Sequence, residues 1–259
     1  MAGTLSVLFK KNKQLNTDEL IRKKTFWSFF IFFCLIISAF MGWKLLQQQP
    51  KVNGVLRPFK NVMAANEQVF NKILSDKHLA KEYPLSEAVP VPRVNGYLGM
   101  GNEFDASQWS LIVVRKNGDT LRVSLDQIKK LPKKDLVFNF KCIEGWCQVS
   151  HWAGARFSDF ISAFGLQDES AFKYVGMSTP DQQYYVGIDM PSALHPQTLL
   201  CYEMNGKPLP MNQGYPLRLI IPVKYGVKSI KRIGTMKFSD NRPPDYWADK
   251  KGYDYFSGL

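Results

Sequence analysis

The chain has 259 residues, of which 45% are hydrophobic and 14% aromatic, and its formal net charge is +12. This length suits one sizeable globular domain with additions, and the apolar content excludes an intrinsically disordered chain. Four cysteines are too few for the disulfide framework of a small secreted domain. A basic chain is typical of proteins that bind nucleic acid, anionic lipid or a phosphate-bearing cofactor.

The N-terminal part combines a basic tail, residues 1–24, with an apolar segment, residues 25–46. No charge occurs from Thr25 to Trp43, which is enough to span the roughly 30 Å hydrocarbon core of a bilayer. The run is too long for the apolar region of a cleaved signal peptide, and no A-x-A site follows it. Because lysine and arginine are denser before it than after it, we expect a single-pass anchor in the cytoplasmic membrane. The N-terminus would lie inside and the remaining domain on the periplasmic side, which argues against nucleic acid as a partner.

Residues 47–92 are predicted to link this helix to a globular domain. Apolar residues recur at helical spacing over Phe59 to Leu79, which predicts an amphipathic helix that packs on the domain or lies near the membrane surface. The stripe consists of Phe59, Val62, Met63, Val69, Phe70, Ile73 and Leu74. Three prolines, Pro84, Pro90 and Pro92, then predict an extended connector over residues 83–94.

The globular domain is predicted to occupy residues 93–259. Apolar runs predict strands at 109–115, 121–123, 136–140, 174–177, 184–188, 199–202, 217–221 and 230–238. Ser124 with Gln127 predicts a capped short helix, and aromatic residues from Phe157 to Phe164 predict another. Strands outnumber helices and do not alternate with them regularly, so the expected fold class is α+β with mixed, β-rich sheets.

Chemistry-bearing residues gather after the strand at 136–140, in a segment that we predict to be an irregular loop. Cys142 lies at the end of that strand, and Cys147 and His151 follow within nine residues. Three interpretations fit this spacing about equally. They are a zinc site, a Cys142–Cys147 disulfide, and a single thiolate that binds one soft, high-valent metal.

A second cluster lies between Gly214 and Arg232, where the chain has five basic residues and no acid. These are Arg218, Lys224, Lys228, Lys231 and Arg232. They bracket an apolar strand and a Tyr-Gly turn that should be partly buried, and buried cations need an anionic partner. Turn amides combined with lysine and arginine commonly hold a phosphate. We therefore predict that this segment binds a phosphorylated cofactor.

The segments that carry both clusters also show a family resemblance. Residues 93–247 resemble the molybdopterin-binding domain of the sulfite oxidase superfamily, and most of all its bacterial periplasmic branch of protein-methionine-sulfoxide reductase catalytic subunits. The matching segments, in chain order, are RVNGYLG, CIEGWCQVSHWAG, YVGMST, ALHPQTLL, GKPLPMNQGYPLRLIIPVKYGVKSIK and RPPDYW. The resemblance covers most of the predicted domain.

The resemblance implies a role for individual residues. Cys142 takes the position of the cysteine that binds molybdenum beside the pterin dithiolene, and His195 also matches the family pattern. The implied cofactor-binding residues are Asn95, Leu98, Gly99, Thr179, Gln213, Arg218, Ser229, Ile230 and Lys231. Cys147 and His151 stand where relatives have serine and proline, which makes them candidates for the mouth of the site.

The resemblance implies a membrane-anchored, molybdopterin-dependent oxidoreductase that performs two-electron oxygen-atom transfer. The expected reaction is reduction of a sulfoxide-type or other oxo-substrate, small or protein-bound, with electrons from a membrane haem or quinol-linked partner. The first alternative is a non-catalytic accessory subunit of a membrane complex with a Cys142–Cys147 disulfide. The second is a thiol-redox or zinc protein.

Overall fold

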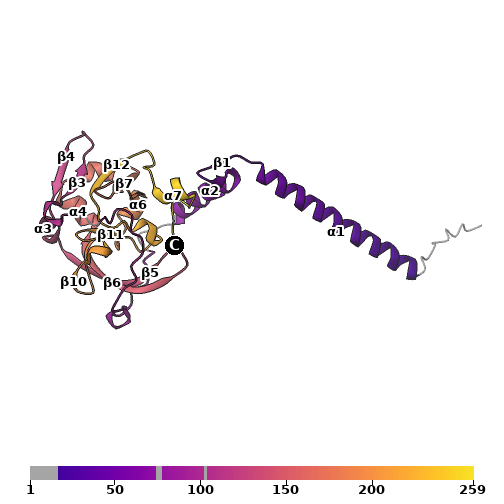
Figure 1. Ribbon diagram of the computed structural model, residues 1–259, viewed down its shortest axis with the longest axis horizontal. Helices are drawn as coiled ribbons and strands as arrows, with labels where there is room; N and C mark the ends of the chain where they lie inside the picture. The colour runs from indigo at the N-terminus through magenta and orange to yellow at the C-terminus, as the bar shows by residue number, and fades with distance from the viewer. Residues whose placement is uncertain (1–16, 74–77, 102–103) are drawn as a thin grey trace, which may run out of the picture. The chain divides into compact units, whose positions relative to one another are not determined.

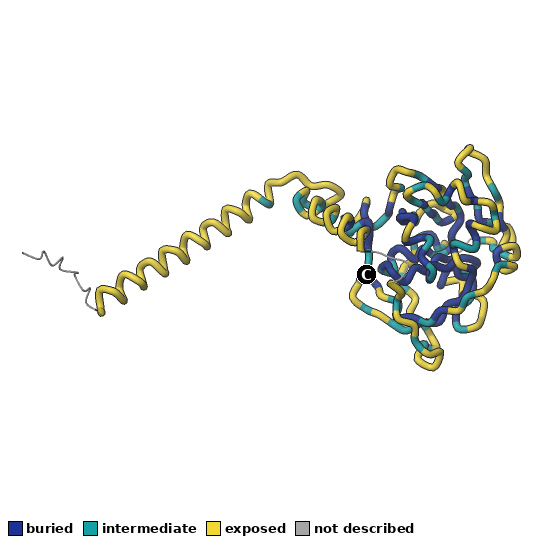
Figure 2. Tube along the Cα trace, turned by 180° about the vertical axis from the view of Figure 1, so that it is seen from behind, coloured by how far each residue is buried: buried dark blue, intermediate teal, exposed yellow. Residues whose placement is uncertain are grey.

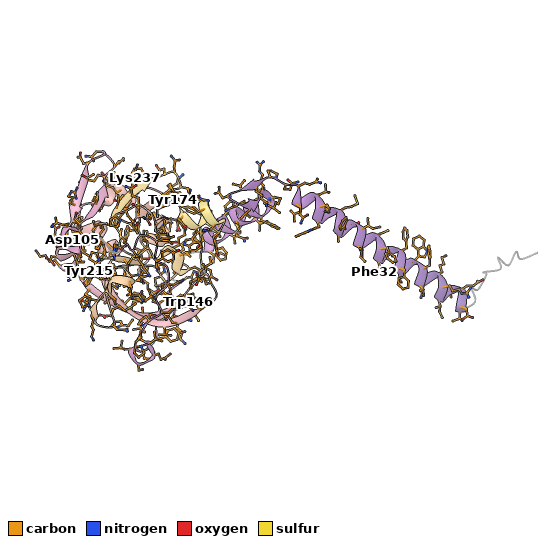
Figure 3. The ribbon with its side chains drawn as sticks, viewed as in Figure 1. Phe32, Asp105, Trp146, Tyr174, Tyr215 and Lys237 are labelled. Carbon is orange, nitrogen blue, oxygen red and sulfur yellow. The ribbon has the colours of Figure 1, made fainter. Side chains whose placement is uncertain are left out.

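The computed structural model describes residues 17–73, 78–101 and 104–259, and it divides into two compact units, residues 1–50 and 51–259. The described part of the first unit contains a long helix, α1 (Thr17–Gln47), in which no residue is buried. Its apolar side chains project outward, as Phe32 does in Figure 3. By length and composition α1 can cross a membrane or act as a signal. It begins before the predicted span and includes Arg22, while residues 1–16 of the basic tail lie outside the described residues.

The second unit opens with a small hairpin and an amphipathic helix. The hairpin pairs β1 (Lys51–Val52) with β2 (Val55–Leu56), and α2 (Arg57–Ile73) follows directly. Leu74, the last member of the predicted stripe, lies outside the described residues. Residues 78–97 are mostly extended, and they contain one 3-10 turn, η1 (Leu85–Glu87).

Two five-stranded sheets form the body of this unit (Figure 1). The first has the order β10-β9-β6-β5, with β11 also paired to β9, and is antiparallel throughout. Its strands are β5 (Lys133–Lys141), β6 (Cys147–Arg156), β9 (Leu199–Met204), β10 (Lys207–Pro208) and β11 (Arg218–Ile220).

The second sheet has the order β4-β3-β12-β7-β8, and only its β3–β12 pair is parallel. Its strands are β3 (Leu111–Val114), β4 (Thr120–Val123), β7 (Tyr174–Ser178), β8 (Tyr185–Asp189) and β12 (Thr235–Ser239). The mixed, β-rich α+β fold predicted from the sequence is thereby confirmed.

Short helices and 3-10 turns connect these strands. They are η2 (Ala106–Gln108), α3 (Leu125–Lys129), α4 (Phe157–Ala163), α5 (Gln167–Ser170), α6 (Met190–Ala193), η3 (Met211–Gln213), η4 (Gly226–Lys228) and α7 (Tyr246–Lys251). The predicted cap of α3 is confirmed, because Ser124 and Gln127 form a reciprocal capping box.

The main core joins the two sheets. Side chains of the second sheet, such as Val113 and Met236, pack in one cluster with Leu200 and Leu219 of the first sheet and with Phe157 of α4. A smaller apolar cluster contains other residues of the first sheet and has Phe140 packed against it. The first sheet is therefore apolar on both faces. Figure 2 shows buried residues gathered in the interior of the second unit, while α1 is exposed along almost its whole length.

Two predicted elements are wrong. The segment after Cys142 is not an irregular loop, because Cys147–Arg156 forms the ten-residue strand β6 between β5 and β9. Its burial on both faces removes the alternation of apolar and polar residues that reveals a strand. The strand predicted at 230–238 is confined to β12 (Thr235–Ser239), because Arg232 has a φ of +49° and residues 229–234 are bent and irregular.

Candidate cofactor-binding site

A cavity lies beside the first sheet and collects residues from distant parts of the chain. Seven of the predicted site residues line it: Asn95, Leu98, Cys142, Gln213, Arg218, Ser229 and Lys231. Ten further residues line it that are not among the predicted cofactor-binding residues, although the sequence already indicated Trp146 as a pocket residue and Gly96 as part of a ligand-approaching loop. They are Arg93, Gly96, Phe140, Trp146, Gln148, Trp152, Tyr184, Gly226, Val227 and Trp247. Many of the latter are aromatic or apolar, so a polar group at this site is held between apolar walls.

Cys142 follows β5 directly, and the hairpin to β6 fixes its position. Its backbone N–H donates to the carbonyl oxygen of Trp146 at 2.9 Å, and the residue is 7% exposed. The Asn95 amide Nδ2 donates to the Cys142 sulfur at 3.4 Å and to a Glu144 carboxylate oxygen at 3.2 Å. A carboxylate that also accepts from the Trp146 indole at 3.2 Å thus orients the amide toward the sulfur.

The two competing interpretations of the cysteine segment are not supported. Cys142 and Cys147 are both free thiols, so the disulfide of the accessory-subunit alternative is not formed. Across residues 17–73, 78–101 and 104–259, no group of three His, Cys, Asp or Glu side chains is placed to hold a metal ion. A zinc site built by the protein alone therefore has no ligand set in the described chain.

Arg218, on β11, is a buried cation at the cavity. Its guanidinium donates to the Gln213 backbone and side-chain oxygens at 3.0 and 3.1 Å and to the Ser229 carbonyl at 3.2 Å. It also lies 4.5 Å from the centre of the Trp152 ring. In the described chain neither Arg218 Nε nor Trp152 Nε1 has a hydrogen-bond partner. Burial lowers the pKa of Arg218 to about 10, since no carboxylate among the described residues compensates the charge.

Lys231 joins the two loops that border the cavity. Its ammonium donates to the carbonyl oxygens of Asn95, Gly96 and Asn212, the last two at 3.1 and 3.0 Å. Burial, followed by repulsion from Arg218, lowers the pKa of Lys231 to about 7. An anion in the cavity would favour the charged form of both residues.

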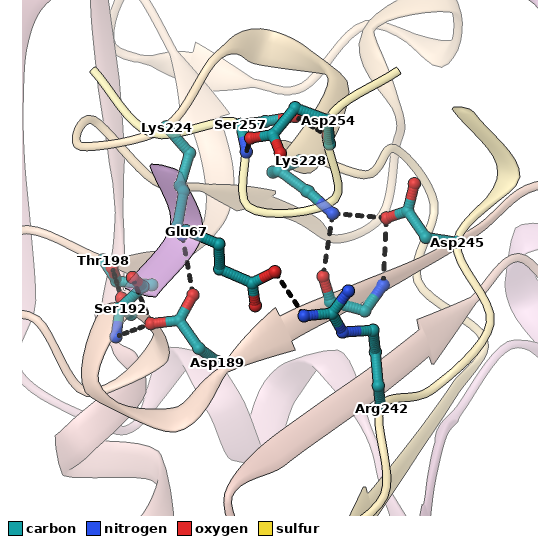
Figure 4. Close-up of polar contacts among 11 residues, drawn as sticks. Glu67, Asp189, Ser192, Thr198, Lys224, Lys228, Arg242, Asp245, Asp254 and Ser257 are labelled. Atoms are coloured by element: carbon teal, nitrogen blue, oxygen red, sulfur yellow. Dashed lines mark hydrogen bonds and ion pairs between the residues drawn. The ribbon is translucent and has the colours of Figure 1, made fainter. Parts of the chain in front are cut away.

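The other three basic residues of the cluster are not free to bind an anion, which corrects the sequence-based expectation. Lys224 pairs with Asp189 at 2.7 Å and Lys228 pairs with Asp245 at 2.5 Å, and all four side chains are buried (Figure 4). Arg232 donates to backbone carbonyl oxygens. Because Lys228 ends η4, its ion pair holds the turn that presents Gly226 and Val227 to the cavity.

Three predicted cofactor-binding residues do not line the cavity but support it. Gly99 has a φ of +73°, and a Cβ at this position would lie 2.3 Å from Thr179 Cγ2. The Thr179 hydroxyl donates to Asp181 Oδ1 at 2.6 Å, so the threonine is a fixed surface against which the glycine packs. Ile230 is fully buried in the main core.

The remaining residues singled out in the sequence also lie away from the cavity lining. His151 is placed 2.8 Å from Asp135 Oδ1 across the β5–β6 pair. His195 is buried, with its Nε2 3.3 Å from the His78 carbonyl oxygen. Cys147 is exposed at the start of β6. Departures from the family pattern at Cys147 and His151 therefore do not shape the described cavity wall.

The cavity has the donor set of a site for an anionic cofactor with a soft metal. A thiol that can serve as a soft ligand faces it. Three cations without carboxylate partners, Arg93, Arg218 and Lys231, and two unpartnered buried N–H groups border it within the described chain. These features define a protein that binds an anionic, metal-bearing cofactor, because the described residues leave these cations and N–H groups without acidic partners.

Comparison with known proteins identifies the family that this chain resembles. The family model for the oxidoreductase molybdopterin binding domain matches residues 98–247. A protein of Azospira oryzae, provisionally named protein-methionine-sulfoxide reductase subunit YedZ1, is 35% identical over 195 residues, which cover 74% of this chain and 73% of that protein. The protein-methionine-sulfoxide reductase catalytic subunit MsrP of Xanthomonas campestris is 34% identical over 59% of this chain and 52% of its own length. The sulfane dehydrogenase SoxCD structure from Paracoccus pantotrophus has a TM-score of 0.49 at 15% identity, over 56% of this chain and 41% of its own.

The chain belongs to the oxidoreductase molybdopterin-binding domain family, and the resemblance seen in its sequence is confirmed. It is a molybdenum-dependent oxidoreductase whose cofactor is molybdopterin. The chain spans about half the length of the Xanthomonas relative. Substrate, reaction direction and partners of this chain are therefore matters for proposal.

Proposed function

We propose that this protein reduces a sulfoxide-type substrate, free or within a protein, by two-electron oxygen-atom transfer. The observation that carries the proposal is that the Cys142 thiol and the Arg218 guanidinium, which has no carboxylate partner in the described chain, line the same cavity. The proposal draws its substrate from the relatives, two of which are named as protein-methionine-sulfoxide reductase components. The same site would serve another oxo-substrate by the same residues.

The protein residues bind and orient the cofactor. Cys142 would be the thiolate ligand of molybdenum, with the Asn95 amide donating to its sulfur. Arg218 and Lys231 would neutralise the phosphate end, and Arg218 would use the Nε that lacks a partner in the described chain. When bound, the molybdenum–pterin group supplies the oxygen-atom transfer chemistry.

The walls of the cavity exclude water and select the substrate. Trp146, Trp247 and Phe140 line it, and Arg93 stacks on Trp146 at 4.8 Å from the ring centre. A sulfoxide has an apolar carbon skeleton and one strongly hydrogen-bond-accepting oxygen. Aromatic walls with a cation at the rim suit such a molecule.

The proposed organisation places the enzyme at a membrane. Residues 1–24 would form a cytoplasmic tail, 25–46 a transmembrane helix, 47–92 a linker and 93–259 the molybdopterin domain on the periplasmic side of the cytoplasmic membrane. The length and apolar character of α1 support this arrangement. Electrons would come from a membrane haem or quinol-linked partner.

The test is an assay of the full-length protein, purified from cells that make the cofactor, with reduced viologen as the electron donor. We expect oxidation of the viologen on addition of methionine sulfoxide, either free or in an oxidised protein. Cys142→Ser should remove this activity, and Cys147→Ser should keep it because Cys147 lies outside the cavity lining. Molybdenum-loaded protein that reduces no sulfoxide would refute the proposed substrate class.

A further inference from the structure

One face of α2 is fastened to the C-terminal part of the domain. Glu67, which is 5% exposed, forms an ion pair with Arg242 (Figure 4). Seven residues (about two helical turns) earlier, on the same face, the Lys60 ammonium donates to the carbonyl oxygens of Ala248 and Tyr253, both at 3.4 Å. These contacts fix the rotation of α2 about its own axis.

The opposite face of α2 carries an apolar stripe that the described domain leaves exposed. Its centre consists of Val62, Val69 and Ile73, which are 57%, 54% and 57% exposed, and Phe59 at its edge is 46% exposed. Val62 and Val69 each follow a fastening residue, Lys60 or Glu67, by two positions, which is a rotation of about 200° around a helix. A stripe of this kind normally packs against another apolar surface.

The charges of α2 complement an anionic surface. Its sequence contains one acid, Glu67, and that carboxylate is taken up by Arg242. Lys72 is exposed and lies about 60° around the helix from Val69, and Arg57 is exposed at the first position of the helix. A helix with an apolar stripe and basic flanks is the pattern of segments that lie in the boundary between lipid headgroups and acyl chains.

The connection between α1 and α2 is short. α1 ends at Gln47 and α2 begins at Arg57, so only nine residues separate a helix that can cross a membrane from the exposed stripe. We propose that α2 docks on the lipid surface, with its apolar stripe among the acyl chains and Arg57 and Lys72 at anionic headgroups. This inference rests on the proposed membrane anchor.

The docking would give the cavity a fixed orientation toward the bilayer. α2 is bonded to Ala248 of α7, and the preceding residue of α7, Trp247, lines the cavity. Lipid contact through one face of α2 and protein contact through the other would prevent the enzyme from turning freely on its tether. The cavity would then meet a membrane-embedded electron donor in one geometry.

The experiment uses the full-length protein alone in nanodiscs of phosphatidylethanolamine and phosphatidylglycerol. In a Cys34→Ser/Cys147→Ser background, a fluorescent thiol label is attached at Val62→Cys or Val69→Cys on the stripe, or at Gln68→Cys on the polar flank. Cys142 and Cys201 are buried and remain. Because all three label sites are exposed, the labels do not disturb the core. Native Cys34 of α1, labelled in Cys147→Ser protein, reports on the anchor.

Quenching by lipids that carry a nitroxide on the acyl chain is the readout. We expect quenching at both stripe positions to exceed that at Gln68→Cys by about twofold or more, as for a helix lying in the interface. Equal quenching at stripe and flank, with Cys34 quenched, overturns the lipid docking and assigns the stripe to a protein partner. Absence of quenching at Cys34 overturns both anchor and docking. Sulfoxide reduction in the same sample tests the proposed function separately.

Discussion

The ion pair between Lys228 and Asp245 should be essential for the stability of the domain. Its side chains are 2% and 3% exposed, and the carboxylate also accepts from the backbone amides of Gly187 and Ala248 at 3.2 and 3.1 Å. The two amides donate to different carboxylate oxygens, so Asp245→Asn keeps an acceptor for only one of them, and it leaves the Lys228 ammonium buried without a counter-charge. Breaking a buried pair in this way costs about 3–5 kcal/mol. At about 2–4 °C per kcal/mol for a domain of this size, the melting temperature should fall by roughly 6–20 °C.

The assay is thermal unfolding of the detergent-solubilised full chain, with a surface ion pair as the matched control. Glu203→Gln removes the partner of Lys133, whose side chain is 48% exposed, and should leave the melting temperature unchanged within error. The double variant Asp245→Asn/Lys228→Met removes both buried charges and should regain part of the loss. If Asp245→Asn shifts the melting temperature no more than Glu203→Gln does, the pair is hydrated and the reasoning is wrong.

Three further predictions concern the cavity. Arg218→Gln should lower cofactor retention at least tenfold, since a charge-assisted hydrogen bond contributes about 1.5–3 kcal/mol; molybdenum per chain after dilution and gel filtration measures it, and unchanged retention would contradict the assigned anion contact. Stability of the cofactor-free protein should rise between pH 7 and 10.5, because the pKa of Lys231 is lowered to about 7 in the fold from 10.5, so the unfolded chain binds more protons there. Denaturant melts should show this rise weakened in Lys231→Met, and an unaltered slope would exclude Lys231 as its source. Gly99→Ala should cost about 1–3 kcal/mol, because its Cβ would overlap Thr179 at a positive φ; a melt equal to wild type would show that the loop relaxes freely.

Local signals in the sequence were enough for much of the fold. Ser124 and Gln127 predict the N-terminal cap of α3, and apolar runs predict most strands of both sheets to within a few residues. β6 was not predicted, because it is buried on both faces between two strands and its sequence therefore shows no alternation of apolar and polar residues. Gly154 does not interrupt it: a Cβ there would lie 2.1 Å from the Leu200 carbonyl oxygen, so the glycine allows β6 and β9 to approach closely.

The site was predictable where the family pattern specifies residues, and less so where tertiary pairing decides. The sequence alone does not show that Lys224 and Lys228 form ion pairs with acids, whereas Arg218 has no carboxylate partner in the described chain. The acids that neutralise the two lysines, Asp189 and Asp245, come from segments 35 and 17 residues away. Only the fold shows which cations remain available for an anion.

The central claim is that the Cys142 sulfur binds molybdenum in this cavity, and X-ray absorption at the molybdenum K edge tests it most directly. Spectra of the wild-type protein and of Cys142→Ser, both purified from cells that make the cofactor, report the sulfur neighbours of the metal. We predict that the substitution removes one sulfur neighbour while the dithiolene sulfurs remain. Wild-type protein without molybdenum, or an identical sulfur shell in both proteins, would contradict the account.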